Sequence, residues 1–146
     1  MTEDTLISAI MTAQGQIDFL WQFFVTVHIA IFALLFIYDR AVDNLNWIAR
    51  IMAVGGIAAF EYINGNALAH TYQVLDAMLD QYRWSFGQAE RFHPAFYEQF
   101  VLASYKNRPN VVMMTHSTAI VIVILAFISK RFIQSHDAGR APETHS

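Results

Sequence analysis

Apolar residues along this 146-residue chain gather in three stretches separated by polar segments. Residues 19–38 and 111–129 each hold about 20 residues without a formal charge, which matches a bilayer core about 30 Å thick. Both stretches predict membrane-spanning helices. The third stretch, residues 46–68, carries Arg50 and Glu61, and its uncharged part (51–60) is only about half as long as a span needs.

The placement of basic residues favours a third crossing through this middle stretch. Arg40 follows the first stretch, Arg50 opens the middle one, and Lys130 and Arg131 close the last. Three crossings put all of them on one side of the membrane, as the positive-inside rule requires, whereas two crossings divide them. The sequence therefore predicts an all-α integral membrane protein with three transmembrane helices. We expect an inner or plasma membrane, and the same rule puts the N-terminus outside and the C-terminus in the cytoplasm.

The segments around these spans have different characters. Residues 1–18 carry apolar side chains at helical spacing and predict an N-terminal helix in the membrane interface. The membrane domain covers residues 19–132, and within it residues 69–108 predict an aromatic-rich helical cap on the outer face. That helical pattern continues the middle span unless Asn64-Gly65-Asn66 interrupts it. Residues 133–146 are polar and predict a disordered cytoplasmic tail.

Composition narrows the class of function. The chain is 55% hydrophobic and 14% charged, which is too apolar for an ordinary soluble domain of this size. A net charge of −3 without a basic block argues against nucleic acid as a partner. The absence of cysteine excludes a disulfide, a thiolate metal site and a thiol nucleophile. No phosphate-binding loop or hydrolase motif occurs, so we expect a protein that is not an enzyme.

Small residues on the middle stretch predict close helix packing. At about 100° per residue, Ala49, Ala53 and Gly56 lie on one flank of the stripe that carries Glu61, and Gly55 and Ala59 lie on the opposite side. Small side chains let membrane helices approach closely. We therefore expect the middle helix to pack between the other two.

A carboxylate in hydrocarbon is costly unless it is protonated, paired or hydrated, so Glu61 needs an explanation. His28 in the first stretch and His116 in the third lie at a comparable predicted depth, and Asn64 follows Glu61 by about one helical turn. In one interpretation the histidines simply satisfy the carboxylate and fix the helix register. In another, Glu61, His28, His116 and Asn64 form a path that conducts or couples to a proton or a small cation.

A third interpretation is a metal- or haem-binding redox subunit. Imidazole and carboxylate ligands suit zinc, copper or iron, and two histidines on different spans can ligate a haem. His28, His116, Glu61 and Met113 are the candidate ligands. The sequence contains no pair of ligands at a recognised metal-binding spacing.

A fourth interpretation is a structural membrane subunit without chemistry of its own. The aromatic residues of the outer segment are typical of headgroup-level elements and of docking surfaces, and Trp84, Phe96 and Phe100 are the candidate contacts. A chain of this size has little room for an internal substrate cavity. We therefore expect the bilayer as its environment and either self-association or a larger membrane complex as its assembly.

Overall fold

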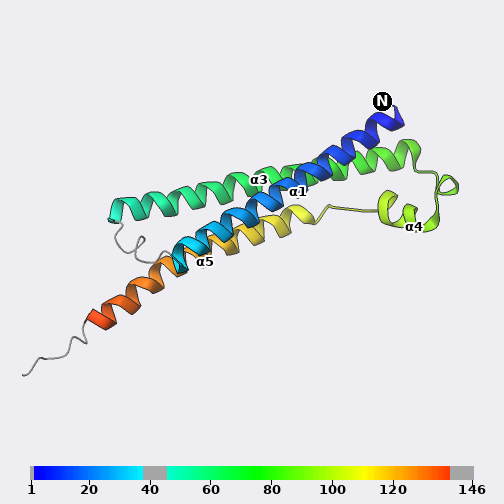
Figure 1. Cartoon of the computed structure of the whole chain (residues 1–146). Coiled ribbons are helices and arrows are strands. Elements are labelled where there is room, and N and C mark those ends of the chain that lie inside the picture. Colours follow the sequence, from blue (N-terminus) through cyan, green and yellow to red (C-terminus); the bar gives the residue numbers. More distant parts are fainter. Residues whose placement is uncertain (1, 38–45, 139–146) are drawn as a thin grey trace, which may run out of the picture.

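The computed structural model describes residues 2–37 and 46–138, and gives residues 127–138 as backbone only. The described residues are 89% helical and contain no strand. Three long helices form the body, and short helical turns lie at one end (Figure 1). The elements are α1 (Glu3–Phe36), α3 (Trp47–Phe86), η1 (Ala89–Arg91), α4 (Pro94–Phe96), η2 (Tyr97–Val101) and α5 (Arg108–Ala138).

Helix α1 runs for 34 residues without interruption. The side chain of Thr2 caps it by accepting a hydrogen bond from the Thr5 amide, and Glu3 and Asp4 place negative charge in its first turn. The predicted division between an N-terminal segment (1–18) and a first span (19–38) therefore falls within one helix. Its last described turn ends at Phe36, and Arg40 lies outside the described residues.

Helix α3 is 40 residues long and joins two predicted elements, the middle span and the first helix of the outer cap. It begins at Asn46, whose side chain accepts a hydrogen bond of 2.8 Å from the Ala49 amide, and it ends at Gly87. The Asn64-Gly65-Asn66 sequence does not break it. Asn64 and Gly65 are both buried within the bundle, so tertiary packing outweighs their weak helix propensity.

Helix α5 contains the whole of the predicted third span (111–129). It continues to Ala138 and so includes the first residues of the predicted tail (133–146). Residues 139–146 of that tail lie outside the described residues.

Helix α3 packs against both other long helices and runs antiparallel to each of them (Figure 1). The middle helix thus packs between its neighbours, as the sequence predicted. The glycines that the sequence suggested for these contacts, however, do not make them. A Cβ atom added at Gly55 or Gly56 would meet nothing within 4 Å, so these glycines touch no neighbouring helix of the chain. The close approach instead occurs at Gly65, against α5.

The contact between α1 and α3 is an antiparallel seam with coiled-coil spacing. From Leu68 on, buried residues of α3 recur at alternating steps of four and three, namely Leu68, Tyr72, Leu75, Leu79 and Tyr82. Those of α1 begin with the same alternation at Leu6, Ile10, Ala13 and Ile17. This repeat keeps one face of each helix directed at its partner over many turns. Burying one leucine of the seam contributes about 1.5–3 kcal/mol.

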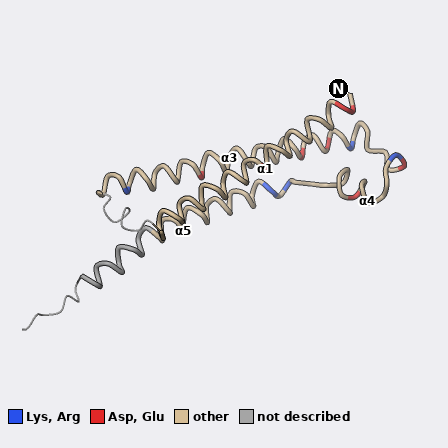
Figure 2. The backbone as a smooth tube through the Cα atoms, in the orientation of Figure 1, with Lys and Arg blue, Asp and Glu red and all other residues tan. Residues whose placement is uncertain are grey.

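The molecule divides into two halves along its length. The charged half comprises residues 2–18 and 64–108, and the apolar half comprises residues 19–37, 46–63 and 109–126. Figure 2 shows acidic and basic residues gathered at the end that carries the N-terminus and α4. Within the apolar half, Arg50 and Glu61 are the charged residues.

Two polar side chains of α3 attach the loop that follows it. Arg83 donates from Nε to the Val101 carbonyl at 2.6 Å and from a second nitrogen to the Ala103 carbonyl. Asp76 accepts from the Tyr105 amide at 2.6 Å. These hydrogen bonds fold η2 and the segment before α5 back onto α3.

The first turn of α1 is bound at the same end. Glu3 accepts hydrogen bonds from the Tyr82 hydroxyl at 2.9 Å and from Arg91 at 3.0 Å. Both hydrogen bonds lower the pKa of the Glu3 carboxyl below its ordinary value of 4.5, and the one from Tyr82 has the larger effect. Both partners favour the carboxylate, so the contact joins α1, α3 and η1 when Glu3 is ionised.

We expect the stability that Glu3 provides to depend on pH. Because its folded-state pKa is lowered, the contribution is present above pH 4.5 and is lost as the pH falls through the lowered value. Glu3→Gln should therefore lower the thermal midpoint of the purified protein at neutral pH and have little effect in acid. Asp4→Asn, in the same helical turn, is the control. An equal destabilisation by Glu3→Gln at every pH would contradict this role.

Candidate functional site

Four buried polar residues lie where all three long helices are in contact, namely His28, Glu61, Asn64 and His116. Glu61 on α3 is fully buried, with 0% of its surface exposed, and His28 on α1 is 9% exposed. The His28 Nε2 atom lies 3.2 Å from the Glu61 Oε1 atom. The predicted meeting of these two residues, from stretches more than 30 residues apart in sequence, is thus present in the fold.

The other nitrogen of His28 fixes the chemistry of this pair. Its Nδ1 atom lies 2.8 Å from the backbone carbonyl oxygen of Phe24, one turn earlier on α1. A carbonyl oxygen can only accept, so Nδ1 carries a hydrogen and donates it. The Nε2 atom that faces Glu61 is consequently a lone pair when the ring is neutral and an N–H group when the ring is charged.

The two residues therefore have to share a proton. If His28 is neutral, its Nε2 lone pair faces Glu61, and the contact is favourable only when Glu61 is a carboxylic acid. If His28 is an imidazolium, the contact is favourable with a Glu61 carboxylate. In both cases one exchangeable proton lies between α1 and α3, and the pair has no net charge.

The pair is not a complete hydrogen-bonding arrangement. Nε2 and Oε1 are close, but they are not aligned as a hydrogen bond, and neither oxygen of Glu61 has a hydrogen-bond donor among the described residues. Buried polar atoms without a partner are rare in proteins and often mark a functional position. His28 lies next to Oε1, so Oε2 of Glu61 is a buried acceptor with no donor among the described residues.

His116 and Asn64 form a second pair, between α5 and α3. The His116 Nδ1 atom lies 2.9 Å from the Val112 carbonyl oxygen, so it donates, and Nε2 accepts from Asn64 Nδ2 at 3.1 Å. Both ring nitrogens are satisfied in the neutral form. His116 is 2% exposed and Asn64 is 4% exposed. This pair is a closed hydrogen-bonded unit, in contrast to His28 and Glu61.

Gly65 makes room for the His116 ring. A Cβ atom at this position would come within 3.1 Å of the ring carbons, which is closer than a side chain tolerates without displacement. The helix interior is unfavourable for glycine by about 1 kcal/mol relative to alanine. The packing of His116 explains why glycine stands here.

Aromatic side chains surround the two histidines. The ring of Phe24 lies with its centroid 4.1 Å from that of His28 and 4.5 Å from that of His116. Trp21 lies 6.0 Å from His116 and donates from its indole N–H to the Tyr72 hydroxyl at 3.1 Å. Trp21 and Tyr72 thus add another hydrogen bond between α1 and α3, next to the histidine pairs.

All four residues predicted for an ion or proton path lie in this region, in two separate pairs. The sequence did not identify Phe24, Gly65 or the Trp21–Tyr72 hydrogen bond as parts of it. The position of Phe24 one turn before His28 was the available signal. The apolar run contains several phenylalanines, and nothing in the sequence distinguishes Phe24 from the others.

The candidate metal ligands do not converge. Among the residues that the structure describes, no group of three or more His, Asp or Glu side chains could hold a metal ion. The Nε2 atoms of His28 and His116 face Glu61 and Asn64. Met113, the soft ligand proposed beside His116, packs against the apolar core.

The candidate docking residues differ in their exposure. Trp84 is 89% exposed and Phe96 is 48% exposed. Phe100 is half-buried and packs with its ring 5.8 Å from that of Tyr82 and 5.0 Å from that of Phe96. Phe100 therefore supports the packing of the cap, while Trp84 projects into the surroundings.

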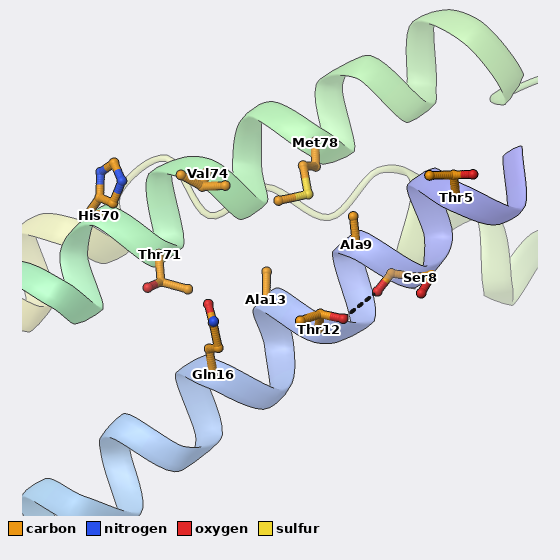
Figure 3. A pocket seen from close by; sticks show the side chains of 10 residues that line it. All are labelled: Thr5, Ser8, Ala9, Thr12, Ala13, Gln16, His70, Thr71, Val74 and Met78. Carbon is orange, nitrogen blue, oxygen red and sulfur yellow. Dashed lines mark hydrogen bonds between the residues drawn. The ribbon is translucent and has the colours of Figure 1, made fainter. Parts of the chain in front are cut away.

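A groove of about 480 Å³ lies between α1 and α3 in the charged half. Figure 3 shows Gln16 of α1 and Thr71 of α3 pointing toward one another across it. The hydroxyls of Thr12 and Thr71 donate to backbone carbonyls of their own helices, at 2.8 Å in each case. The groove does not include His28, Glu61, Asn64 or His116.

We expect Gly65→Ala to lower the stability of the protein by about 1–3 kcal/mol, because the added methyl group displaces the His116 ring. Gly56→Ala is the matched control on the same helix, where a Cβ atom meets nothing, and it should leave stability unchanged or raise it by up to about 1 kcal/mol. Thermal or denaturant unfolding in detergent measures both. Equal effects of the two substitutions would contradict the close contact.

Comparisons with protein-family models, with curated proteins and with solved structures gave no match to this chain. Neither the fold nor the site can therefore be assigned through a relative. The two polar pairs and their surroundings carry the functional assignment.

Proposed function

We propose that this chain is a three-span integral membrane protein that binds an exchangeable proton at His28 and Glu61. Its membrane location is supported by α1 and α5, which are long and apolar enough to cross a bilayer. Only 11% of the apolar part of α1 and 17% of that of α5 are buried within the chain. An apolar helix in the core of a soluble protein would be largely buried, so lipid is the environment that this exposure favours.

The apolar half of α3 supplies the third crossing. It contacts α1 through Phe60, whose ring lies 5.3 Å from that of Phe23, and it exposes large apolar side chains, among them Trp47, Ile48, Ile51, Met52 and Ile63. A helix of 40 residues is about 60 Å long, twice the thickness of the hydrocarbon core. One half of α3 therefore stands outside the membrane, where the charged half carries the ionisable residues. The positive-inside rule then puts Arg50 at the cytoplasmic side and the N-terminus outside.

The natural absence of cysteine allows a direct test of the third crossing. We expect Trp47→Cys and Ser85→Cys, at opposite ends of α3, to react with a membrane-impermeant maleimide from opposite sides of sealed vesicles. Both positions are exposed, so labelling requires no unfolding. Labelling of both from the same side would show that α3 does not cross the membrane.

A single observation carries the proposed proton site. The Phe24 carbonyl holds His28 with Nδ1 as a donor, and this leaves Nε2 3.2 Å from the fully buried Glu61. The two residues are satisfied only when they share a proton. A metal cation would need several oxygen or nitrogen ligands, and the described residues around Glu61 supply only His28. The arrangement favours a proton over a larger cation.

The burial of Glu61 favours coupling over conduction. No part of Glu61 is exposed, and the Asn64–His116 pair and Phe24 lie beside it. An open channel would leave the carboxylate in contact with water. We infer an occluded proton site whose occupancy affects the α1–α3 contact. A chain of this kind acts as a self-associating unit or as an accessory subunit of a membrane complex, because it encloses little space for another substrate.

Glu61→Gln tests the proposed function without removing the contact. A glutamine amide can donate to the neutral Nε2 of His28, so folding should be retained, but it cannot release a proton. We expect the number of protons that the purified protein exchanges between acid and alkaline pH, measured by titration of an unbuffered detergent solution, to fall by about one per chain. The infrared carbonyl band of a buried carboxylic acid should disappear as well.

Glu98→Gln, on the exposed surface of η2, is the control and should keep both signals. If the pair only fixes helix register, Glu61→Gln will leave the infrared difference between acid and neutral pH unchanged. Replacing the pair with apolar residues would then be neutral or stabilising, as it is for many buried ion pairs. That result would overturn the proposed function.

A further inference from the structure

Phe24 occupies a special position with respect to the two histidines. Its ring centroid is 4.1 Å from that of His28 and 4.5 Å from that of His116, so it contacts both histidine rings, one from each polar pair. Trp21 meets its edge at 5.6 Å in a T-shaped contact. Other phenylalanines of α1 lie farther out: Phe19 is 64% exposed and Phe23 is 46% exposed.

The two histidines that Phe24 separates are held in the same tautomer. Each donates from Nδ1 to the carbonyl one turn earlier, His28 to Phe24 and His116 to Val112. They differ only in the partner of Nε2, which is Glu61 for His28 and Asn64 for His116. The titratable groups that face His28 from the other helices are Glu61 on α3 and His116 on α5.

We propose that the Phe24 ring is the partition that confines the exchangeable proton to His28 and Glu61 and keeps His116 out of the proton-sharing unit. The inference rests on the proposed function, because it defines the boundary of the same site. Phe24 is a positioning residue here, since it neither gives nor takes a proton.

Transfer past this partition would be chemically balanced. A proton would leave the His28–Glu61 pair and bond to His116 Nε2, and the Asn64 amide would turn so that its Oδ1 accepts the new N–H group. After the transfer His28 is neutral, Glu61 is a carboxylate, and His116 is an imidazolium. The transfer costs free energy because it separates a Glu61 carboxylate from a His116 imidazolium, whereas the original His28–Glu61 pair has no net charge. The Phe24 ring, in contact with both histidines, occupies the space through which this proton would pass.

Phe24 also has space into which it can move. It lines a groove of about 530 Å³ against α5, together with residues that include Thr115, Ala119 and Ile122. The Thr115 hydroxyl donates to the Val111 carbonyl at 2.9 Å, so the groove wall offers an apolar surface to the ring. Displacement of Phe24 into this groove would remove the partition without rearranging the helices.

The test follows the ring nitrogens of both histidines by ¹⁵N NMR as the pH is varied, in protein labelled at histidine and reconstituted in phospholipid nanodiscs. His28→Gln and His116→Gln assign the signals. In the wild type we expect His28 to change with pH and His116 to remain in its neutral Nδ1–H form. In Phe24→Ala we expect His116 to shift with pH together with His28.

Phe19→Ala is the matched control, because its exposed ring contacts only Phe23 among the described aromatic rings. It should leave His116 unchanged. Phe24→Leu provides a second variant that preserves more volume if Phe24→Ala unfolds, and it should give a smaller shift in the same direction.

The possible failures have different meanings. If His116 stays neutral in both Phe24 variants, the partition is wrong and the proton site stands. The same conclusion follows if His116 already titrates with His28 in the wild type. If wild-type His28 does not respond to pH at all, the proposed function fails, and the partition fails with it.

Discussion

The buried carboxyl group of Glu61 is the constraint on which the arrangement of the helices depends. An ionised carboxylate without a partner is costly in an apolar environment, and a neutral one still needs its proton placed. The Nε2 atom of His28, 3.2 Å away on α1, is the group placed to share its proton. Because the contact joins α1 to α3, it fixes the register of two helices that otherwise present repetitive apolar surfaces to each other.

That register extends into the charged half. The seam from Leu68 to Tyr82 on α3 meets Leu6 to Ile17 on α1, and a slip by one step would separate Glu3 from Tyr82 as well as His28 from Glu61. Polar contacts therefore lie at both ends of a long apolar seam. Seams of this kind commonly use a few polar pairs for register and apolar layers for stability. The His116–Asn64 pair gives the same kind of register to α5.

Much of the helical content could be predicted because it follows from local periodicity. The apolar runs, the caps at Thr2 and Asn46, and the stripe of Leu68, Tyr72, Leu75 and Leu79 all lie in the sequence. The glycines show where that approach fails. Gly55 and Gly56 looked like packing residues, yet Gly65 makes the close contact, within a sequence that resembled a helix break. Local patterns cannot show which glycine a neighbouring helix approaches.

By itself, the sequence determined that the chain is helical and that two of its helices suit a membrane. It also identified Glu61, His28, His116 and Asn64 as polar side chains whose burial in apolar helices is costly. Only the tertiary structure decided how they combine. It paired His28 with Glu61 and His116 with Asn64, placed Phe24 against both histidine rings, and set the tautomers through backbone carbonyls. The physical reason is that the free-energy cost of burying a side chain depends on the residue type, which the sequence gives directly. Proton sharing depends on distances between atoms of different helices, which are set by their rotation and register.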